Sequence, residues 1–132
     1  MIVGIGCDIV DHEMTTKLGW LSNKHIINRI LSPPELAIFE KQKNINFISG
    51  RFAAKEALLK CLGTGMKDGI SLLDISVIQT DNFQPVIQID GELKKLIQLM
   101  KIDRWHISIS HTPNSSLAFV IAISNDNICF KK

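Results

Sequence analysis

The sequence predicts an α+β fold, in which an antiparallel sheet carries helices packed on one side. Three observations predict it. Residues 105–123 form two runs of alternating residues around a turn-forming cluster at 112–116, the pattern of a β-hairpin. Residues 1–10 read MIVGIGCDIV, a short apolar run typical of a strand. Residues 51–62 contain no Gly or Pro and are rich in strong helix formers. Strands joined mainly by hairpins favour an antiparallel sheet.

Size and composition indicate one domain spanning residues 1–132. A chain of 132 residues with 45% hydrophobic content can bury a core of its own. The net charge is only +2, aromatic residues make up 6%, and tyrosine is absent. Nucleic-acid-binding proteins usually carry a dense basic stripe with aromatic platforms. We therefore expect no nucleic-acid partner.

The cysteines and the amino terminus indicate a cytoplasmic protein. Cys7, Cys61 and Cys129 are widely spaced and form no Cys-x-x-Cys pair, so we expect reduced, buried thiols. The first residues lack a basic region, and Asp8 interrupts the apolar run, which argues against a signal peptide. No stretch reaches the length of a membrane span. We expect no membrane partner.

The first predicted strand places a carboxylate on an unusual face. With a period of two, Asp8 shares a face with Gly4 and Gly6, which clear it of side chains. A carboxylate in an apolar strand is costly to bury unless it is paired or metal-bound. The space beside it suits a ligand or a close backbone approach. The alternative is an Asp that caps the following turn, helped by Asp11 and His12.

Two helical segments are predicted next, one at about 15–29 and one starting at Pro33-Pro34-Glu35, because proline suits the first helical turn. In the helix at 51–62, Phe52, Glu56 and Lys60 stand four apart and share one stripe. Small residues form a neighbouring stripe that would let another backbone pack closely; they are Ala53, Ala57 and Cys61.

Gly63 ends this helix, since glycine readily takes the left-handed conformation that a helix terminus needs. A carboxylate, a lysine one turn on and the loop Gly63-Thr64-Gly65 are the parts of a site for a phosphorylated ligand. The simpler interpretation is a surface ion pair between Glu56 and Lys60, worth roughly 0.2–0.5 kcal/mol, followed by a turn.

The rest of the chain completes the fold. Residues 73–80 and 85–89 are predicted as strands around a turn at Asp81-Asn82, and residues 91–100 have a helical pattern. In the carboxyl-terminal hairpin, His111 continues an apolar stripe where the first strand ends. A histidine in that position is more often structural than a ligand, so both roles remain open.

Three motifs together resemble one family. GIGCDIV near the start, GRFAAKEALLKCLGTG in the middle and SISHT near the end have the order and spacing of the bacterial holo-acyl-carrier-protein synthases, the small 4'-phosphopantetheinyl transferases. The resemblance covers nearly the whole chain and includes a weaker segment at 29–32 with Glu35 following. One departure is visible, because Met14 stands where the family usually places an arginine that helps to dock the carrier protein, and Lys17 is the nearest cation.

The resemblance implies a fold, a reaction and an assembly. The fold would be 4'-phosphopantetheinyl transferase-like, and three chains would form a homotrimer with active sites at subunit contacts. Coenzyme A would donate its 4'-phosphopantetheine group to a serine of apo acyl carrier protein. The products would be the holo carrier, for fatty acid biosynthesis, and adenosine 3',5'-bisphosphate. We expect the acidic carrier to dock on the basic residues of the first helical region, Lys17, Lys24 and Arg29.

The resemblance also implies roles for individual residues. Asp8 and Glu56 would hold Mg²⁺, a hard ion suited to carboxylates and substrate phosphates. Glu56 and Lys60 would be catalytic, with Glu56 accepting the serine proton directly or through a metal-bound water, and Lys60 supplying positive charge near the phosphates. Arg51 would bind the nucleotide end, within one chain or across a subunit boundary. The remaining contacts to coenzyme A would come from Gly63, Thr64, Gly65, His111 and Thr112.

Two other functions use the same residues. A Mg²⁺-dependent phosphohydrolase would employ the same carboxylates to activate water. A non-catalytic module would bind coenzyme A or a carrier protein without turnover. Both remain open on the residues alone, and the presence or absence of transfer to a carrier distinguishes them.

Overall fold

The computed structural model of the chain describes residues 1–63 and 70–125. Its elements, in chain order, are β1 (Ile2–Asp11), α1 (His12–Lys17), α2 (Lys24–Ile30), α3 (Pro33–Lys41), α4 (Ile45–Cys61), a 3-10 turn (Leu72–Asp74), β2 (Ile75–Gln79), β3 (Pro85–Ile89), α5 (Gly91–Leu99), β4 (Arg104–His111) and β5 (Ser115–Ile123). The carboxyl-terminal hairpin and the strands at 75–79 and 85–89 lie where the sequence predicts them.

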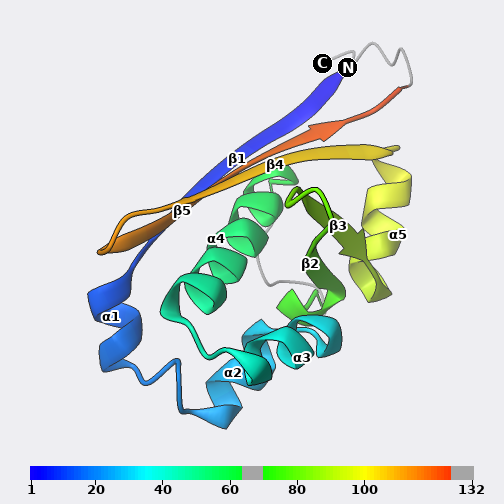
Figure 1. The fold of residues 1–132 in the computed structure, drawn as a ribbon. Coiled ribbons are helices and arrows are strands. Elements are labelled where there is room, and N and C mark those ends of the chain that lie inside the picture. Colours follow the sequence, from blue (N-terminus) through cyan, green and yellow to red (C-terminus); the bar gives the residue numbers. More distant parts are fainter. Residues whose placement is uncertain (64–69, 126–132) are drawn as a thin grey trace.

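The strands form two antiparallel sheets. The larger sheet has the order β1-β5-β4, and β2 pairs only with β3. The long helix α4 runs across one face of the larger sheet, with the β2-β3 hairpin and α5 beside it (Figure 1). In the register of the larger sheet, Asp8 faces Ala118 across β1 and β5, and His111 faces Ser116 across β4 and β5. The predicted α+β class with helices on one side of an antiparallel sheet is confirmed.

Small residues let α4 lie directly on β1. A Cβ atom on Gly6 would come within 1.8 Å of the Ala57 carbonyl oxygen, and one on Gly4 within 2.1 Å of the Cys61 carbonyl oxygen. Ala57 and Cys61 belong to the small-residue stripe that the sequence indicates, and both are buried. The space cleared by the two glycines is therefore filled by the backbone of α4.

The helical region before α3 differs from the prediction. A single helix at 15–29 was expected, whereas α1 ends at Lys17 and α2 begins at Lys24. Gly19 takes a left-handed backbone conformation with φ of +74° and stops α1, since such a residue cannot continue a right-handed helix. Asn23 then caps α2, its side chain accepting hydrogen bonds from the amides of His25 and Ile26.

The central helix is also longer than predicted. It begins at Ile45, behind Asn44, whose side chain accepts a hydrogen bond from the Asn46 amide. The prediction began after Gly50 because glycine is a poor helix former. Gly50 is needed inside the helix, since a Cβ atom there would lie 2.8 Å from Cε1 of His111.

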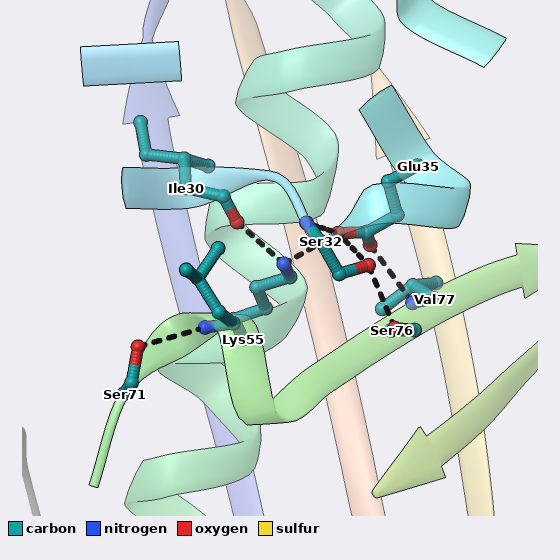
Figure 2. A network of polar contacts seen from close by, with 8 residues as sticks. Ile30, Ser32, Glu35, Lys55, Ser71, Ser76 and Val77 are labelled. Atoms are coloured by element: carbon teal, nitrogen blue, oxygen red, sulfur yellow. Dashed lines mark hydrogen bonds and ion pairs between the residues drawn. The ribbon is translucent and has the colours of Figure 1, made fainter. Parts of the chain in front are cut away.

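A buried ion pair and its hydrogen bonds join α3, α4 and β2 (Figure 2). Nζ of Lys55 donates to Oε1 of Glu35 at 2.5 Å, and both side chains have no exposed surface. The same oxygen accepts hydrogen bonds from the amide and hydroxyl of Ser32, and Oε2 accepts one from the Val77 amide. Lys55 also donates to the Ile30 carbonyl. Glu35 thus links α3, α4 and β2, a role the sequence did not indicate.

The opposite face of the larger sheet carries exposed apolar side chains. Ile9 is 66% exposed and Ile5 57% exposed, and Leu117 and Phe119 of β5 are also exposed on this face. Cys7 shares the face and is exposed, so the expectation that it is buried was wrong. The reason is that no described element covers this side of the sheet. We call these side chains of β1 and β5 the outer apolar face.

Cys61 does fit the expectation of a buried thiol. It is a free cysteine whose Sγ donates to the Val120 carbonyl at 3.1 Å. Burial raises the pKa of this thiol to about 11, which keeps it protonated and unreactive. Cys129 lies outside the described residues. Among the described helices, none is long and apolar enough to cross a membrane.

Candidate active site

The contact between β1 and α4 brings Asp8 to the stripe of Glu56 and Lys60. Asp8 follows Gly6 by two residues on the same face of β1, so it lies just beyond the point where the two backbones touch. Nζ of Lys60 donates to Oδ1 of Asp8 and to the carbonyl oxygen of Cys7, both at 3.0 Å. Capping of the next helix falls instead to Asp11, whose side chain accepts a hydrogen bond from the Glu13 amide.

Glu56 completes this cluster, and the pKa of its carboxyl group is raised. It is half-buried, and burial is the main reason why its pKa is raised; the negative charge of Asp8 raises it further, and Lys60 opposes both. The pKa of Lys60 is raised, first by its hydrogen bond to Asp8 and then by the charge of Asp8. Lys60 therefore forms its ion pair with Asp8 of β1 and not with Glu56 on its own helix.

The two carboxylates fit a magnesium ion better than a metal held by protein alone. Within residues 1–63 and 70–125, no group of three or more His, Cys, Asp or Glu side chains could hold a metal. Mg²⁺ is commonly bound through one or two carboxylates, with waters and substrate phosphates filling the remaining positions. Burial raises the pKa of Glu56 most and repulsion by Asp8 raises it further; a divalent cation bound by both carboxylates would relieve that repulsion.

A second cluster lies where α4 meets β4 and the β2-β3 hairpin. Arg51 and His111 line a cavity of about 410 Å³ here; its other lining residues are Gln79, Phe83, Pro85, Ile107, Ser108 and Ile109. The Arg51 guanidinium stacks on the Phe47 ring at 4.1 Å, and its buried Nε has no hydrogen-bond partner. Burial lowers the pKa of Arg51, and Glu35 partly offsets this. An unsatisfied cationic donor beside a cavity suits an anionic ligand.

His111 and Thr112 stand at the end of β4, next to this cavity. Nδ1 of His111 is 2.7 Å from the Ser116 hydroxyl. The pKa of His111 is lowered, first by partial burial and then by His12 and Arg51. The Thr112 hydroxyl accepts hydrogen bonds from the amides of Asn114 and Ser115, so it shapes the hairpin turn.

The two clusters lie on different sides of α4. Successive helical residues are rotated by about 100°, so Arg51 and Lys60 are about 180° apart around the axis, and Arg51 and Glu56 about 140°. One chain therefore brings together Asp8, Glu56 and Lys60, and separately Arg51 and His111, but it does not bring the two groups together; Thr112 follows His111 in the hairpin turn and does not line the cavity.

Comparison with known proteins assigns the family. The sequence model of the 4'-phosphopantetheinyl transferase superfamily matches residues 4–122, nearly the whole chain. The chain belongs to this superfamily. A holo-[acyl-carrier-protein] synthase from Hydrogenovibrio crunogenus is 39% identical over 125 residues, which are 94% of this chain and 98% of that one.

Solved structures of the family have the same fold. A holo-[acyl-carrier-protein] synthase from Neisseria meningitidis matches with a TM-score of 0.86 and 34% identity, over 94% of this chain and 100% of that chain. Another from Bacillus anthracis, solved in complex with CoA (3',5'-ADP), matches with a TM-score of 0.78 and 34% identity, over 95% and 99%. The predicted family, and the class of the enzyme as a phosphopantetheinyl transferase, are confirmed.

The remaining predicted site residues have mixed outcomes. Gly63 ends α4 with φ of +67°, as the sequence predicts, whereas Thr64 and Gly65 lie outside the described residues. Sequence reasoning missed His12 and Ser116 as neighbours of His111. Their only signal was a histidine directly after β1 and a serine in the hairpin, which no local pattern connects.

Proposed function

We propose that this transferase moves 4'-phosphopantetheine from coenzyme A to a serine of apo acyl carrier protein, and that the second product is adenosine 3',5'-bisphosphate. The serine hydroxyl attacks the β-phosphate, and the nucleotide leaves. The reaction would serve fatty acid biosynthesis in the cytoplasm, a compartment in keeping with the free thiols of Cys7 and Cys61. The single observation that carries the proposal is the cluster of Asp8, Glu56 and Lys60 at the contact of β1 and α4.

Asp8 and Glu56 are the proposed ligands of Mg²⁺. When bound, the ion supplies positive charge that neutralises the pyrophosphate and its leaving group. Lys60 adds a second positive charge. Its side chain is 55% exposed, against 18% for Asp8, so it is free to turn from Asp8 toward a ligand phosphate. Charge of this kind accelerates transfer because negative charge is spread over the phosphoryl group in the transition state.

Glu56 is also the proposed acceptor of the serine proton. An ordinary glutamate is a weak base at neutral pH because its pKa is near 4.3. Burial, the larger cause, raises the pKa of Glu56 and so brings it closer to the operating range of a general base, whereas the smaller effect of Asp8 would be offset by bound Mg²⁺. The half-buried position of Glu56 leaves one side open to substrate.

The second cluster would bind the nucleotide end of coenzyme A. Arg51 and His111 offer cationic or hydrogen-bonding groups on the 410 Å³ cavity, and Thr112 adjoins them. Gly63, Thr64 and Gly65 would contact phosphates at the end of α4. Because Arg51 and Lys60 point to different sides of α4, we propose that one complete site combines the Asp8 cluster of one chain with the Arg51 cluster of another.

A homotrimer would provide such a boundary. The outer apolar face on β1 and β5 supports it, since exposed apolar side chains of this extent usually mark an interaction surface. Cyclic symmetry is the simplest closed arrangement of three chains. Burying the same face in every copy would explain why Ile5, Ile9 and Phe119 are tolerated on the surface of one chain.

The carrier protein would dock near α1 and α2. Met14 and Leu18 stand one turn apart and are exposed, so an apolar contact can take over part of the docking that the family's arginine would supply. Lys17 is engaged by Glu13 at 3.1 Å, which leaves Lys24 and Arg29 as the freer cations for an acidic partner.

One incubation tests the proposed function. The protein is mixed with coenzyme A and Mg²⁺, with and without an apo acyl carrier protein, and the carrier is weighed by mass spectrometry. We expect the carrier to gain one phosphopantetheine group, and only when all components are present. Cleavage of coenzyme A without the carrier would indicate a phosphohydrolase, and no turnover would indicate a binding module; either result refutes the proposal.

A further inference from the structure

Two histidine contacts, a buried one from His12 and a part-buried one from His111, meet at a single hydroxyl. The Ser116 side chain is fully buried, and its Oγ lies 2.7 Å from Nε2 of His12 and 2.7 Å from Nδ1 of His111. His12 comes from the start of α1, and His111 and Ser116 from the facing ends of β4 and β5. The other ring nitrogen of His12, Nδ1, lies 3.2 Å from the Pro113 carbonyl oxygen.

The direction of every hydrogen bond in this chain follows from the carbonyl. A carbonyl oxygen can only accept, so Nδ1 of His12 carries a proton. His12 is 5% exposed, and in its neutral form the ring has no N–H group besides the one on Nδ1. Its Nε2 therefore accepts from the Ser116 hydroxyl. That hydroxyl has a single proton, so it must accept from Nδ1 of His111.

The consequence appears at the far end, where His111 lines the cavity with Arg51. With Nδ1 already protonated, a neutral His111 has a bare Nε2, which is a hydrogen-bond acceptor. Only a protonated His111 can offer an N–H group at Nε2 to a phosphate. We propose that His12 and Ser116 are positioning residues that hold the proton of neutral His111 on Nδ1, so that His111 contacts a phosphate only as the imidazolium.

This inference rests on the proposed function in assigning the phosphate contact to His111; the tautomer stands without it. Partial burial is the main effect that opposes a positive charge on the His111 ring; the titratable or charged groups that face it are His12 from α1 and Arg51 from α4, and each opposes that charge when it is itself protonated. An anion in the cavity would offset both. The contact is thus coupled to pH, and it is lost as pH rises through the pKa of His111 in the complex.

Two substitutions break the chain from different ends. In Ser116→Ala, Nδ1 of His111 loses its acceptor. In His12→Leu, the Ser116 hydroxyl loses its own acceptor and is free to donate to Nδ1 of His111. Both changes should move neutral His111 toward the form with its proton on Nε2. Ser49→Ala is the matched control, since Ser49 is an equally buried serine whose hydroxyl lies 3.4 Å from that of Thr15 and, among the hydrogen bonds of the described residues, makes none to His111.

The direct readout is the nitrogen NMR spectrum of the His111 ring in the protein without substrates, at a pH above its titration. We expect the Nδ1–H form in the wild type and in Ser49→Ala, and a majority of the Nε2–H form in Ser116→Ala and His12→Leu. Because the two variants act at different positions, a folding failure in one leaves the other to decide. An unchanged tautomer in a folded variant would overturn the inference.

The second readout is the KM for coenzyme A between about pH 6 and pH 8.5. Because binding of coenzyme A then requires one proton on His111, the wild-type KM should rise by up to about tenfold per pH unit above the His111 pKa. The rise should be shallower in Ser116→Ala, since a neutral ring could then donate from Nε2, whereas Ser49→Ala should follow the wild type. A KM that rises equally in all three proteins would overturn the phosphate contact of His111, even if transfer itself proceeds and the proposed function holds.

Discussion

At the scale of single residues, the account depends on two carboxylates that influence one another. The pKa of Glu56 is raised by burial first and by Asp8 second. Lys60 binds Asp8 and partly neutralises the pair. Asp8 raises the pKa of Glu56 and Lys60 lowers it, so substituting Asp8 and substituting Lys60 should shift that pKa in opposite directions.

The titration of Glu56 provides the first prediction. In the metal-free protein its carboxyl should titrate above the usual range of glutamate. Asp8→Asn should lower that pKa, because the repelling charge is removed, but not to the usual value, since burial remains the larger cause. Lys60→Met should raise it. Carbon NMR of the side-chain carboxyl measures all three proteins, and the exposed Lys94→Met on α5 serves as the control. A shift of the same sign in both variants would refute the arrangement.

Catalysis provides the second prediction. Asp8→Asn and Glu56→Gln should each lower kcat by about 100-fold or more, as is typical when a transition-state electrostatic contact is lost. Lys60→Ala should lower kcat while leaving the Mg²⁺ concentration for half-maximal rate nearly unchanged. Steady-state transfer over a range of Mg²⁺ concentrations separates the effects. Near wild-type transfer by either carboxylate variant at saturating Mg²⁺ would remove that residue from the proposed site.

At the scale of elements, the approach of α4 to β1 decides whether the site exists. Gly6→Ala would place a methyl group 1.8 Å from the Ala57 carbonyl oxygen, so the helix must move. We expect a loss of about 1–3 kcal/mol in the free energy of unfolding, together with weaker Mg²⁺ binding, since Asp8 and Glu56 separate. Gly19→Ala is the control, because it strains a left-handed backbone without such a contact. Urea denaturation should show a loss of stability for both variants, and Mg²⁺ titration should show weaker binding for Gly6→Ala alone.

The buried pair of Glu35 and Lys55 acts on the other side of α4. Lys55→Met leaves the Glu35 carboxylate buried without its cation and should lower the free energy of unfolding by about 3–5 kcal/mol. Adding Glu35→Gln should recover part of this, since no uncompensated charge then remains. Lys60→Met, on an exposed position of the same helix, should change stability by less than about 1 kcal/mol. Equal effects of the two lysine substitutions in urea denaturation would contradict this role.

Local patterns in the sequence predicted most of these elements, because strand alternation and helix formers act over short distances. The sequence therefore shows the two stripes of α4, the small-residue stripe that includes Ala57 and the stripe that includes Glu56. The break at Gly19 was missed, since one glycine within a helical pattern does not by itself show that the chain turns. Gly50 looks like a helix boundary in the sequence because the feature that requires a glycine inside α4, the ring of His111, lies about 60 residues further along the chain.

At the scale of the whole molecule, long-range pairings explain what the sequence could not reveal. Glu35 of α3 and Lys55 of α4 meet only in the folded chain, and His12 meets Ser116 only because β1 and β5 pair. The family motifs supplied Asp8, Glu56 and Lys60 as a set, and the geometry joins these three. Arg51 and His111 form a second group on another side of α4, which is the reason for proposing a site shared between two chains.

The outer apolar face carries the prediction of a trimer. Light scattering at micromolar concentration should give about 44 kDa for three chains of 14.8 kDa. Ile9→Lys should shift the mass toward the monomer by placing a charge in the contact. Leu99→Lys, at an apolar position on α5 that is also exposed, is the control and should remain trimeric. A wild-type monomer would refute both the trimer and a site shared between subunits.

The central claim is a transfer site completed by two chains. Arg51→Ala damages one half of the site, and Glu56→Gln damages the other. Each variant alone should be nearly inactive in the mass assay for transfer to the carrier. When the two are co-expressed and assemble at random, about one subunit contact in four joins two intact halves. We therefore expect about a quarter of the wild-type rate, whereas a mixture no more active than its parents would contradict the account.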